Sequence, residues 1–267
     1  MKSNPSVQLA DVQAVYDGAG AQLYELFMGR QIHVGGLESS LDLAGLAGIT
    51  AGQNGVELCC GTGASMRALV RLRDVASMVG VEASKTAVER GRDICREQGL
   101  GGAITFALGD ATHTQLGEAD ADFVWSEDAW CYVLDKPALV AEAVRLTRPG
   151  GVIAFTDWVE GAAGLSDEEA EHVMQIMTFP NLYNVDAYRD AFASEGCEVL
   201  VAEDTGRFGP CFALYAQMLQ KQLTFDAFEL LAFSKEIVDV VIEQLIGLAQ
   251  LADAGKLGQM RFVARRP

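Results

Sequence analysis

The hydrophobic pattern between residues 55 and 156 repeats one arrangement. A short apolar run is followed by a longer stretch whose apolar positions recur every three or four residues. Short apolar runs are typical of buried parallel strands, and the longer period is typical of amphipathic helices. The expected strands are 55–59, 77–82, 103–107, 121–125 and 152–156, and the expected helices are 64–72, 84–98 and 136–147. This alternation predicts a doubly wound parallel sheet with right-handed crossovers.

The pattern changes on both sides of this repeat. Helical spacing over residues 8–30 and 37–49, separated by a loop, places about fifty residues before the first strand, where they would cross the mouth of the sheet. After the repeat we expect, in order, an acidic helical insertion at 161–178, a helix at 186–195, a strand at 197–201, a long helical stretch at 211–252 and a last strand at 258–264.

These changes divide the chain into four parts. We expect a helical lid at 1–50, an α/β core at 51–210, a helical lid or insertion at 211–255, and a terminal strand at 256–267 that returns to the core. The last strand is expected to run antiparallel to the others, because residues 255–258 read as a turn into it.

The composition argues against several classes of protein. The chain has 267 residues, 50% of them hydrophobic, and a formal net charge of −17, whereas duplex nucleic acid needs a basic face. No apolar run reaches the ~18 residues of a membrane span, and the first residues lack a signal-peptide pattern. Six scattered cysteines without a Cys-x-x-Cys pair indicate neither a zinc site nor a disulfide framework. A cytoplasmic setting is the simplest expectation.

Candidate chemistry begins at the stretch Val56-Glu57-Leu58-Cys59-Cys60-Gly61-Thr62-Gly63-Ala64, an apolar strand that ends in a glycine turn before a helix. Glycines let the backbone approach a ligand closely, and the following helix presents free N–H groups. Acidic residues then stand at successive strand ends, namely Glu82, Asp110 and the pair Glu127/Asp128. One acid per βα step is what a nucleoside-binding α/β sheet needs.

Together these motifs resemble the class I S-adenosylmethionine-dependent methyltransferases. The residues that carry the resemblance are Glu57 to Gly63, Glu82, Gly109-Asp110-Ala111 and Arg148-Pro149-Gly150-Gly151. The resemblance covers about residues 52–160 and the terminal strand. It implies a Rossmann-like, seven-stranded methyltransferase sheet with helical insertions and an antiparallel last strand, and it implies S-adenosylmethionine as the cofactor, with S-adenosylhomocysteine as its product.

A narrower resemblance points to the sarcosine/dimethylglycine and phosphoethanolamine N-methyltransferases. It rests on Tyr16-Asp17 with Tyr24-Glu25-Leu26-Phe27 and Ile32-His33-Val34-Gly35-Gly36, on Trp125-Ser126-Glu127-Asp128-Ala129, and on Phe179-Pro180-Asn181 before Tyr188. These stretches extend the similarity over most of the chain, although they are looser than the core motifs.

The two resemblances imply three sets of site residues. Cofactor binding is expected from Tyr24, Ile32, His33, Glu57, Gly61, Gly63, Glu82, Ala83, Asp110, Ala111 and Ser126. Contact with the methyl acceptor is expected from Asp128, Trp130 and Phe179, and a catalytic position from Tyr16 and Tyr132. No metal is expected, because displacement at a sulfonium methyl needs mainly alignment and exclusion of water.

Tyr132 marks a departure from the phosphoethanolamine enzymes. Tyr16 matches a tyrosine that those relatives place near the transferred methyl, but they have a histidine where this chain has Tyr132. A histidine exchanges protons near neutral pH, whereas a phenol with a pKa of ~10 does not. We therefore expect the two tyrosines to position and cover the substrate.

The functional hypothesis is methyl transfer to a small molecule, with a small amine of the sarcosine type as the first acceptor class. The alternative is an oxygen, carbon or sulfur acceptor such as a phenol, prenyl chain or thiol, which a dry aromatic pocket without a carboxylate-binding arginine would favour. A non-catalytic cofactor-binding protein is a remote alternative, because all motif glycines and acids are present. We expect neither a nucleic-acid partner nor a membrane, and homodimer formation stays open.

Overall fold

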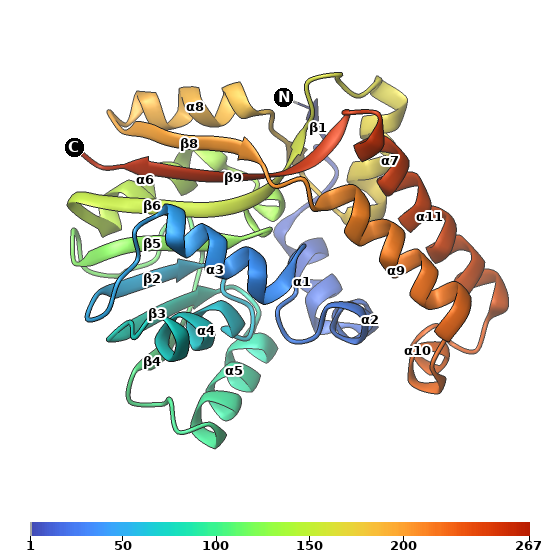
Figure 1. The fold of residues 1–267 in the computed structure, drawn as a ribbon, viewed down its shortest axis with the longest axis horizontal. Coiled ribbons are helices and arrows are strands. Elements are labelled where there is room, and N and C mark those ends of the chain that lie inside the picture. Colours follow the sequence, from blue (N-terminus) through green and yellow to red (C-terminus); the bar gives the residue numbers. More distant parts are fainter. Residues whose placement is uncertain (1) are drawn as a thin grey trace.

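A seven-stranded sheet forms the centre of the computed structural model, which describes residues 2–267 (Figure 1). Its strand order is β4-β3-β2-β5-β6-β9-β8. The strands are β2 Asn54–Leu58, β3 Ser77–Glu82, β4 Ile104–Leu108, β5 Ala121–Glu127, β6 Thr147–Glu160, β8 Glu198–Asp204 and β9 Leu257–Arg265. The pairs from β4 to β6 are parallel, whereas β9 runs antiparallel to both β6 and β8. The predicted fold class, including the reversed last strand, is confirmed.

β6 is longer than the expected strand 152–156. It begins at Thr147, the expected last residue of the preceding helix, and continues to Glu160 because β9 pairs with it from Val152 onward. The extension carries Asp157 and Trp158 beyond the sheet edge expected from the sequence.

Helices cover both faces of the sheet. On one face lie α3 Gly36–Leu46, α4 Ala64–Leu72 and α5 Lys85–Glu97, and on the other lie α6 Lys136–Leu146 and α8 Val185–Ser194. The first three bury apolar side chains such as Leu43, Met66 and Val88 against the strands, while α8 packs Tyr188 and Phe192 near Phe155. Burial of this apolar surface is the main favourable term in folding.

A block of helices lies beside the sheet and contains α7 Asp167–Met177, α9 Phe208–Gln222, α10 Phe225–Leu230 and α11 Lys235–Asp253 (Figure 1). Trp158 of β6 packs against these helices, and its ring meets those of Phe208 and Phe212 edge-on at centroid distances of 4.6 and 5.2 Å. The long helical stretch expected at 211–252 is thus three helices. Thr224 and Ser234 restart it as N-caps, each accepting a hydrogen bond from a backbone N–H three residues later.

The N-terminal segment forms α1 Leu9–Asp17 and α2 Ala19–Met28, which lie beside the carboxyl ends of the central strands (Figure 1). The break between them falls at Gly18, so the stretch 8–30 is two helices. Two features were not anticipated: strand β1 Lys2–Ser3 pairs with β7 Asn181–Leu182, and η1 Trp130–Tyr132 is a short 3-10 helix. Within residues 2–267, no helix combines the length and the apolar character needed to cross a membrane.

Candidate active site

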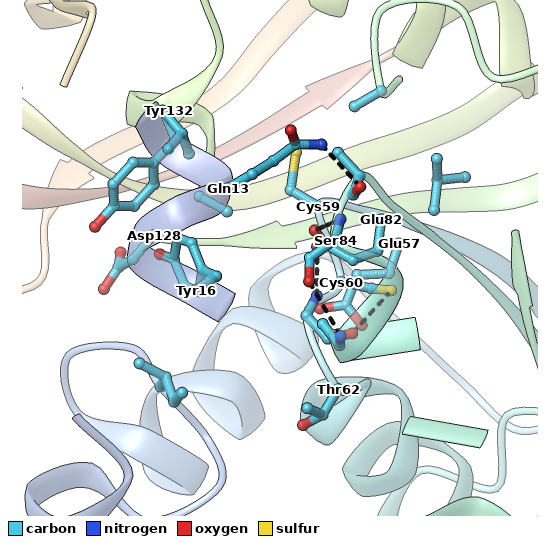
Figure 2. Close-up of a pocket in the computed structure, with 18 of the residues that line it drawn as sticks. Gln13, Tyr16, Glu57, Cys59, Cys60, Thr62, Glu82, Ser84, Asp128 and Tyr132 are labelled. Atoms are coloured by element: carbon cyan, nitrogen blue, oxygen red, sulfur yellow. Dashed lines mark hydrogen bonds between the residues drawn. The ribbon is translucent and has the colours of Figure 1, made fainter. Parts of the chain in front are cut away.

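A cavity of about 310 Å³ opens at the carboxyl ends of β2, β3, β4 and β5, the strands on either side of the point where the order reverses. Its walls come from the segments that follow these strands and from α1, as Figure 2 shows. The strand ends supply lining residues at 59–62, 64–65, 82–84, 86–87, 109–112, 127–129 and 132–135.

Glu82 connects two of these loops. One carboxylate oxygen, Oε2, accepts a hydrogen bond from the Gly61 N–H at 2.9 Å, and Oε1 accepts one from the Ser84 N–H at 2.8 Å (Figure 2). Gly61 and Gly63 both adopt positive φ, and a Cβ on Gly63 would lie 2.6 Å from the Met66 side chain. The glycine turn is therefore required by the backbone, and Glu82 holds it against β3.

Two further carboxylates, Glu57 and Glu127, line the cavity from below the glycine turn. Both are at least nine-tenths buried, and within the described chain Glu57 Oε2 and Glu127 Oε1 have no hydrogen-bond partner. Burial, together with the charge of Glu127, raises the pKa of Glu57 well above its usual range. Buried acids with unused oxygens favour a ligand that brings positive charge or N–H donors.

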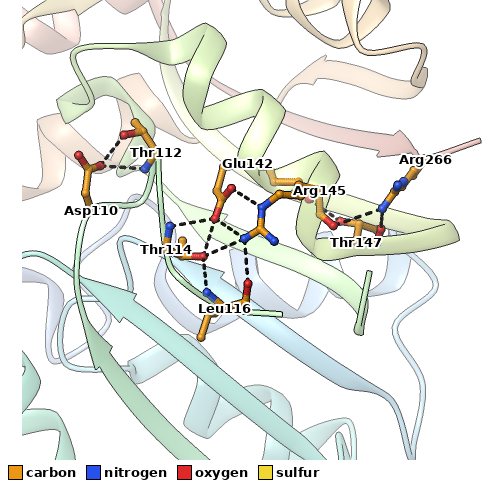
Figure 3. A network of polar contacts seen from close by, with 9 residues as sticks. Asp110, Thr112, Thr114, Leu116, Glu142, Arg145, Thr147 and Arg266 are labelled. Atoms are coloured by element: carbon orange, nitrogen blue, oxygen red, sulfur yellow. Dashed lines mark hydrogen bonds and ion pairs between the residues drawn. The ribbon is translucent and has the colours of Figure 1, made fainter. Parts of the chain in front are cut away.

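The loop after β4 presents Asp110 and Ala111 at the opposite side of the cavity. Asp110 Oδ1 accepts hydrogen bonds from the backbone N–H and the hydroxyl of Thr112, both at 2.8 Å. Farther along the loop, Glu142 Oε1 accepts from the Thr114 N–H at 2.9 Å and from Arg145 at 2.7 Å (Figure 3). The guanidinium of Arg145 holds the pKa of Glu142 low, at about 2, so this charged pair anchors the loop.

Tyr16 of α1 and Tyr132 of η1 meet at the opening of the cavity. Their rings are perpendicular within 8°, at an interplanar angle of 82°, and their centroids are 5.3 Å apart. Burial raises the pKa of both hydroxyls well above the usual value of a tyrosine. Both phenols therefore stay protonated near neutral pH, and neither acts there as a base.

Asp128 joins three distant parts of the chain at the cavity wall. Its Oδ2 accepts from the Val34 N–H at 2.8 Å, and the Gln259 amide donates to both carboxylate oxygens at 2.8 and 2.9 Å. His33, next to Val34, lies 3.2 Å from the Ser40 hydroxyl and 3.5 Å from Glu127. Asp128 thus fixes the loop before α3 to both η1 and β9.

Three predicted contact residues lie outside the cavity. The Ser126 hydroxyl is fully buried and donates to the Leu58 carbonyl oxygen at 2.9 Å. Trp130 stacks on Phe155 in the core at 4.1 Å, and Phe179 packs edge-on behind Tyr132 at 4.9 Å. We therefore correct the expectation of direct ligand contacts from Ser126, Trp130 and Phe179, because their side chains support the wall and do not line it.

The other predicted residues fall at the cavity or next to it. Ile32, His33 and Ala83 line it, Gly63 caps the start of α4 behind it, and Tyr24 lines a smaller neighbouring chamber. The sequence reasoning did not single out the lining residues Gln13 and Ser84. Gln13 donates to the Ala83 carbonyl oxygen at 3.0 Å, a contact between segments 70 residues apart that no local pattern indicates.

Asp157 was also missed, although a carboxylate inside the apolar run of β6 is a visible signal. It is completely buried, and it accepts hydrogen bonds from the Cys131 N–H at 2.9 Å and from the Tyr188 hydroxyl. Burial raises the pKa of Asp157 to about 6. This carboxyl group holds η1, and with it Tyr132, in place.

Residues 56–155 match a family model described as a methyltransferase domain. A sterol 24-C-methyltransferase from Eremothecium gossypii is 30% identical over 167 residues, which cover 61% of this chain and 44% of that relative. The chain spans about half the length of the curated relatives that it matches.

Solved structures agree in fold. Phosphoethanolamine N-methyltransferase 2 from Haemonchus contortus, in complex with S-adenosyl-L-methionine, aligns with a TM-score of 0.85 at 20% identity over 98% of this chain and 60% of that chain. A provisionally assigned sarcosine dimethylglycine methyltransferase from Galdieria sulphuraria aligns with a TM-score of 0.77 at 21% identity over 86% of each chain. At these identities the likeness establishes the fold.

The raised pKa of Asp157 predicts a pH-dependent stability. The folded chain keeps a proton on this carboxyl group up to about pH 6, whereas the unfolded chain releases it near 3.8, the usual pKa of an aspartate. The contribution of Asp157 to the free energy of unfolding therefore falls as pH rises between these values. A shift of this size corresponds to at most roughly 3 kcal/mol. Asp157→Asn should lose this dependence.

Urea denaturation from about pH 4 to about pH 7 measures the effect as a difference between variant and wild type. The free energy of unfolding of Asp157→Asn, minus that of the wild type, should rise with pH. Tyr188→Phe is the control, because it keeps the carboxyl group and removes one donor to it, so its pH dependence should persist and move to higher pH. A difference for Asp157→Asn that is flat with pH would contradict this account.

Proposed function

We propose that this chain, which belongs to the class I S-adenosylmethionine-dependent methyltransferases, binds S-adenosylmethionine in the cavity at the ends of β2 to β5 and transfers its methyl group to a small molecule. The observation that carries the proposal is the arrangement of four acids, Glu57, Glu82, Asp110 and Glu127, around a glycine turn. S-adenosylmethionine brings what these acids need, since it carries an ammonium group, a sulfonium and ribose hydroxyl donors.

Each acid then has a role that fits its position. Glu82 still has a free lone pair on each oxygen beyond its bonds to Gly61 and Ser84, and these accept the two ribose hydroxyls. Asp110 Oδ2 faces the adenine end, with the Ala111 N–H beside it. The unpartnered oxygens of Glu57 and Glu127 accept the ammonium group, which removes the cost of leaving them buried and unpaired.

When bound, the cofactor would supply a methyl carbon that the nucleophilic atom of the acceptor attacks in line, and the electron pair of the breaking carbon–sulfur bond would stay with sulfur in the departing S-adenosylhomocysteine. The chain itself supplies alignment and a dry site. Tyr16 and Tyr132, whose hydroxyls stay protonated, form a wall that orients the acceptor. We also propose that residues 1–50 act as a lid, since α1 reaches the cavity through Gln13 and Tyr16.

Two acceptor classes enter the proposal. The fold-level likeness to enzymes named for phosphoethanolamine and for sarcosine supports a small amine, as expected from the sequence. The sterol relative supports an apolar acceptor. A panel of small amines, phenols, thiols and prenyl diphosphates, assayed with methyl-labelled S-adenosylmethionine, tests the activity. Absence of S-adenosylmethionine binding would exclude the proposal as a whole.

Glu82→Gln tests the cofactor site. The amide keeps the size of the side chain but loses the charge that strengthens hydrogen bonds from ribose hydroxyls, so the affinity for S-adenosylhomocysteine should fall by about 2 to 3 kcal/mol, or roughly 30- to 150-fold in Kd. Calorimetry measures the affinity and urea denaturation checks the fold. Glu89→Gln, an exposed acid on α5 that faces Lys85 at 3.6 Å, is the matched control and should bind normally. Equal affinities in the two variants would make Glu82 a purely structural acid.

Comparison of Tyr16→Phe with Tyr16→Ala distinguishes a packing role of the Tyr16 ring from a chemical role of its hydroxyl. Because Tyr16 packs edge-on against Tyr132 and its hydroxyl is held protonated, Phe should leave turnover within about threefold of wild type, while Ala should lower it at least about tenfold by opening the wall. The measurement is the rate of label transfer to the acceptor that the panel identifies. A loss of about a hundredfold or more in kcat for Phe, with binding and folding intact, would show that the hydroxyl takes part in the chemistry.

A further inference from the structure

A second, smaller chamber of about 40 Å³ lies behind the tyrosine pair. It shares Tyr16, Ile32, His33, Asp128 and Tyr132 with the larger cavity, so these residues form the partition between the two spaces. Its remaining walls come from α2, α7, α9, α11 and the extended end of β6. An acceptor in this chamber would lie next to the larger cavity, separated from it only by these residues.

The walls of the chamber are almost entirely apolar. Beyond the shared residues they consist of aromatic rings and aliphatic or thioether side chains, namely Tyr24, Phe27, Met28, Val34, Trp158, Met177, Phe212, Tyr215 and Leu245. The rings are ordered against one another, for example Phe27 stacks on Tyr215 at 6.3 Å. No lysine or arginine lines the chamber in the part of the chain that the structure describes.

Besides the two phenols, the partition contains one carboxyl group, that of Asp128, and one imidazole, that of His33. Both oxygens of Asp128 are occupied by the Gln259 amide and the Val34 N–H, and burial raises the pKa of its carboxyl group. The Nε2 of His33 faces Ser40 and Glu127. The Nδ1 of His33 is buried and has no hydrogen-bond partner within the described residues, so the partition keeps one unused polar atom. Taking Asp128 from its donors would leave those donors unpaired.

Nearby cations are also unavailable to a ligand in the chamber. Arg90 lines the larger cavity and forms a double hydrogen bond with Glu25, with both distances at 2.5 Å. Arg207 is paired with Asp42. Arg30 is exposed and lines only the larger cavity. A carboxylate or phosphate in the chamber would therefore be desolvated without a counter-charge, which is strongly unfavourable.

Building on the function proposed above, we propose that the methyl acceptor is a neutral, apolar small molecule whose hydrocarbon body packs in this chamber and whose reacting atom faces the cofactor cavity beside the Tyr16–Tyr132 pair. Acceptors that carry a carboxylate or a phosphate, as sarcosine and phosphoethanolamine do, are disfavoured. The apolar walls favour burial of hydrocarbon, and an ion of either sign would lose its hydration against them.

The chamber has to become larger to hold the hydrocarbon part of the acceptor, and movement of α2 would enlarge it. None of the α2 side chains that the structure describes is fully buried, whereas α9, on the opposite wall, buries six residues. Leu23, Tyr24, Phe27 and Met28 only pack against the surface of the helical block. Displacing α2 therefore costs less packing than displacing α9, and Gly18 and Gly29, which flank α2, carry no Cβ to restrict its movement.

Three phenols with one ring and different tails test the acceptor class. The full chain, saturated with S-adenosylhomocysteine, is titrated calorimetrically with para-propylphenol, with para-hydroxyphenylpropanoate and with protonated para-(dimethylaminoethyl)phenol. We expect the neutral phenol to bind at least about tenfold more tightly than either ion. Equal or tighter binding of the anion or the cation would overturn the proposal. So would failure of the neutral phenol to bind.

Leu245→Phe tests whether the neutral phenol binds in the chamber. Leu245 lines it, whereas Leu248, on the same helix and in the same buried block, does not. Leu245→Phe should weaken the neutral phenol by about tenfold or more and leave S-adenosylhomocysteine affinity unchanged, while Leu248→Phe should change neither. Met28→Phe, on the less buried α2, provides the same test if Leu245→Phe does not fold. Unchanged phenol affinity in the chamber variants overturns this inference alone, whereas loss of S-adenosylhomocysteine binding by the wild type would overturn the proposed function.

Discussion

The site depends on the two hydrogen bonds that the Glu82 carboxylate accepts. The carboxylate accepts one backbone N–H from the turn after β2 and one from the turn after β3, and so it fixes the distance between the two walls of the cavity. The parallel strand order makes this possible, because it brings the carboxyl ends of β2 and β3 to the same edge. Glu57 and Glu127 are gathered at the same edge, and their unpartnered oxygens favour a ligand that brings positive charge or N–H donors.

A second polar contact, between Gln259 of β9 and Asp128, connects the antiparallel last strand to the site. Gln259 lies on β9, the strand that runs antiparallel to its neighbours, and its amide reaches Asp128 and the Val34 carbonyl oxygen, the latter at 3.0 Å. The segment before α3, the end of β5 and the last strand are therefore held at one point. Because Asp128 is used in this way, the chamber beside it is left with apolar walls. This contact, far from the chamber in sequence, supports the proposal that the acceptor is neutral.

The sheet and its cofactor edge were predictable from the sequence because their signals are local. A strand, a glycine turn and an acid lie within a few residues of one another, as at Glu57 to Gly63 and at Glu82. The directions of Ser126 and Trp130 were not predictable, since a position near a strand end does not fix whether a side chain faces the cavity or the core. The chamber was not predictable either, because its walls come from many helices, a strand and a loop whose packing no periodicity encodes.

The most direct test of the central claim is a crystal structure of the chain with S-adenosylhomocysteine. The account predicts that both ribose hydroxyls contact the Glu82 carboxylate, that the adenine lies beside Asp110 and Ala111, and that the amino group faces Glu57 and Glu127. A ligand bound elsewhere, or one bound in this cavity with its ribose away from Glu82, would contradict it.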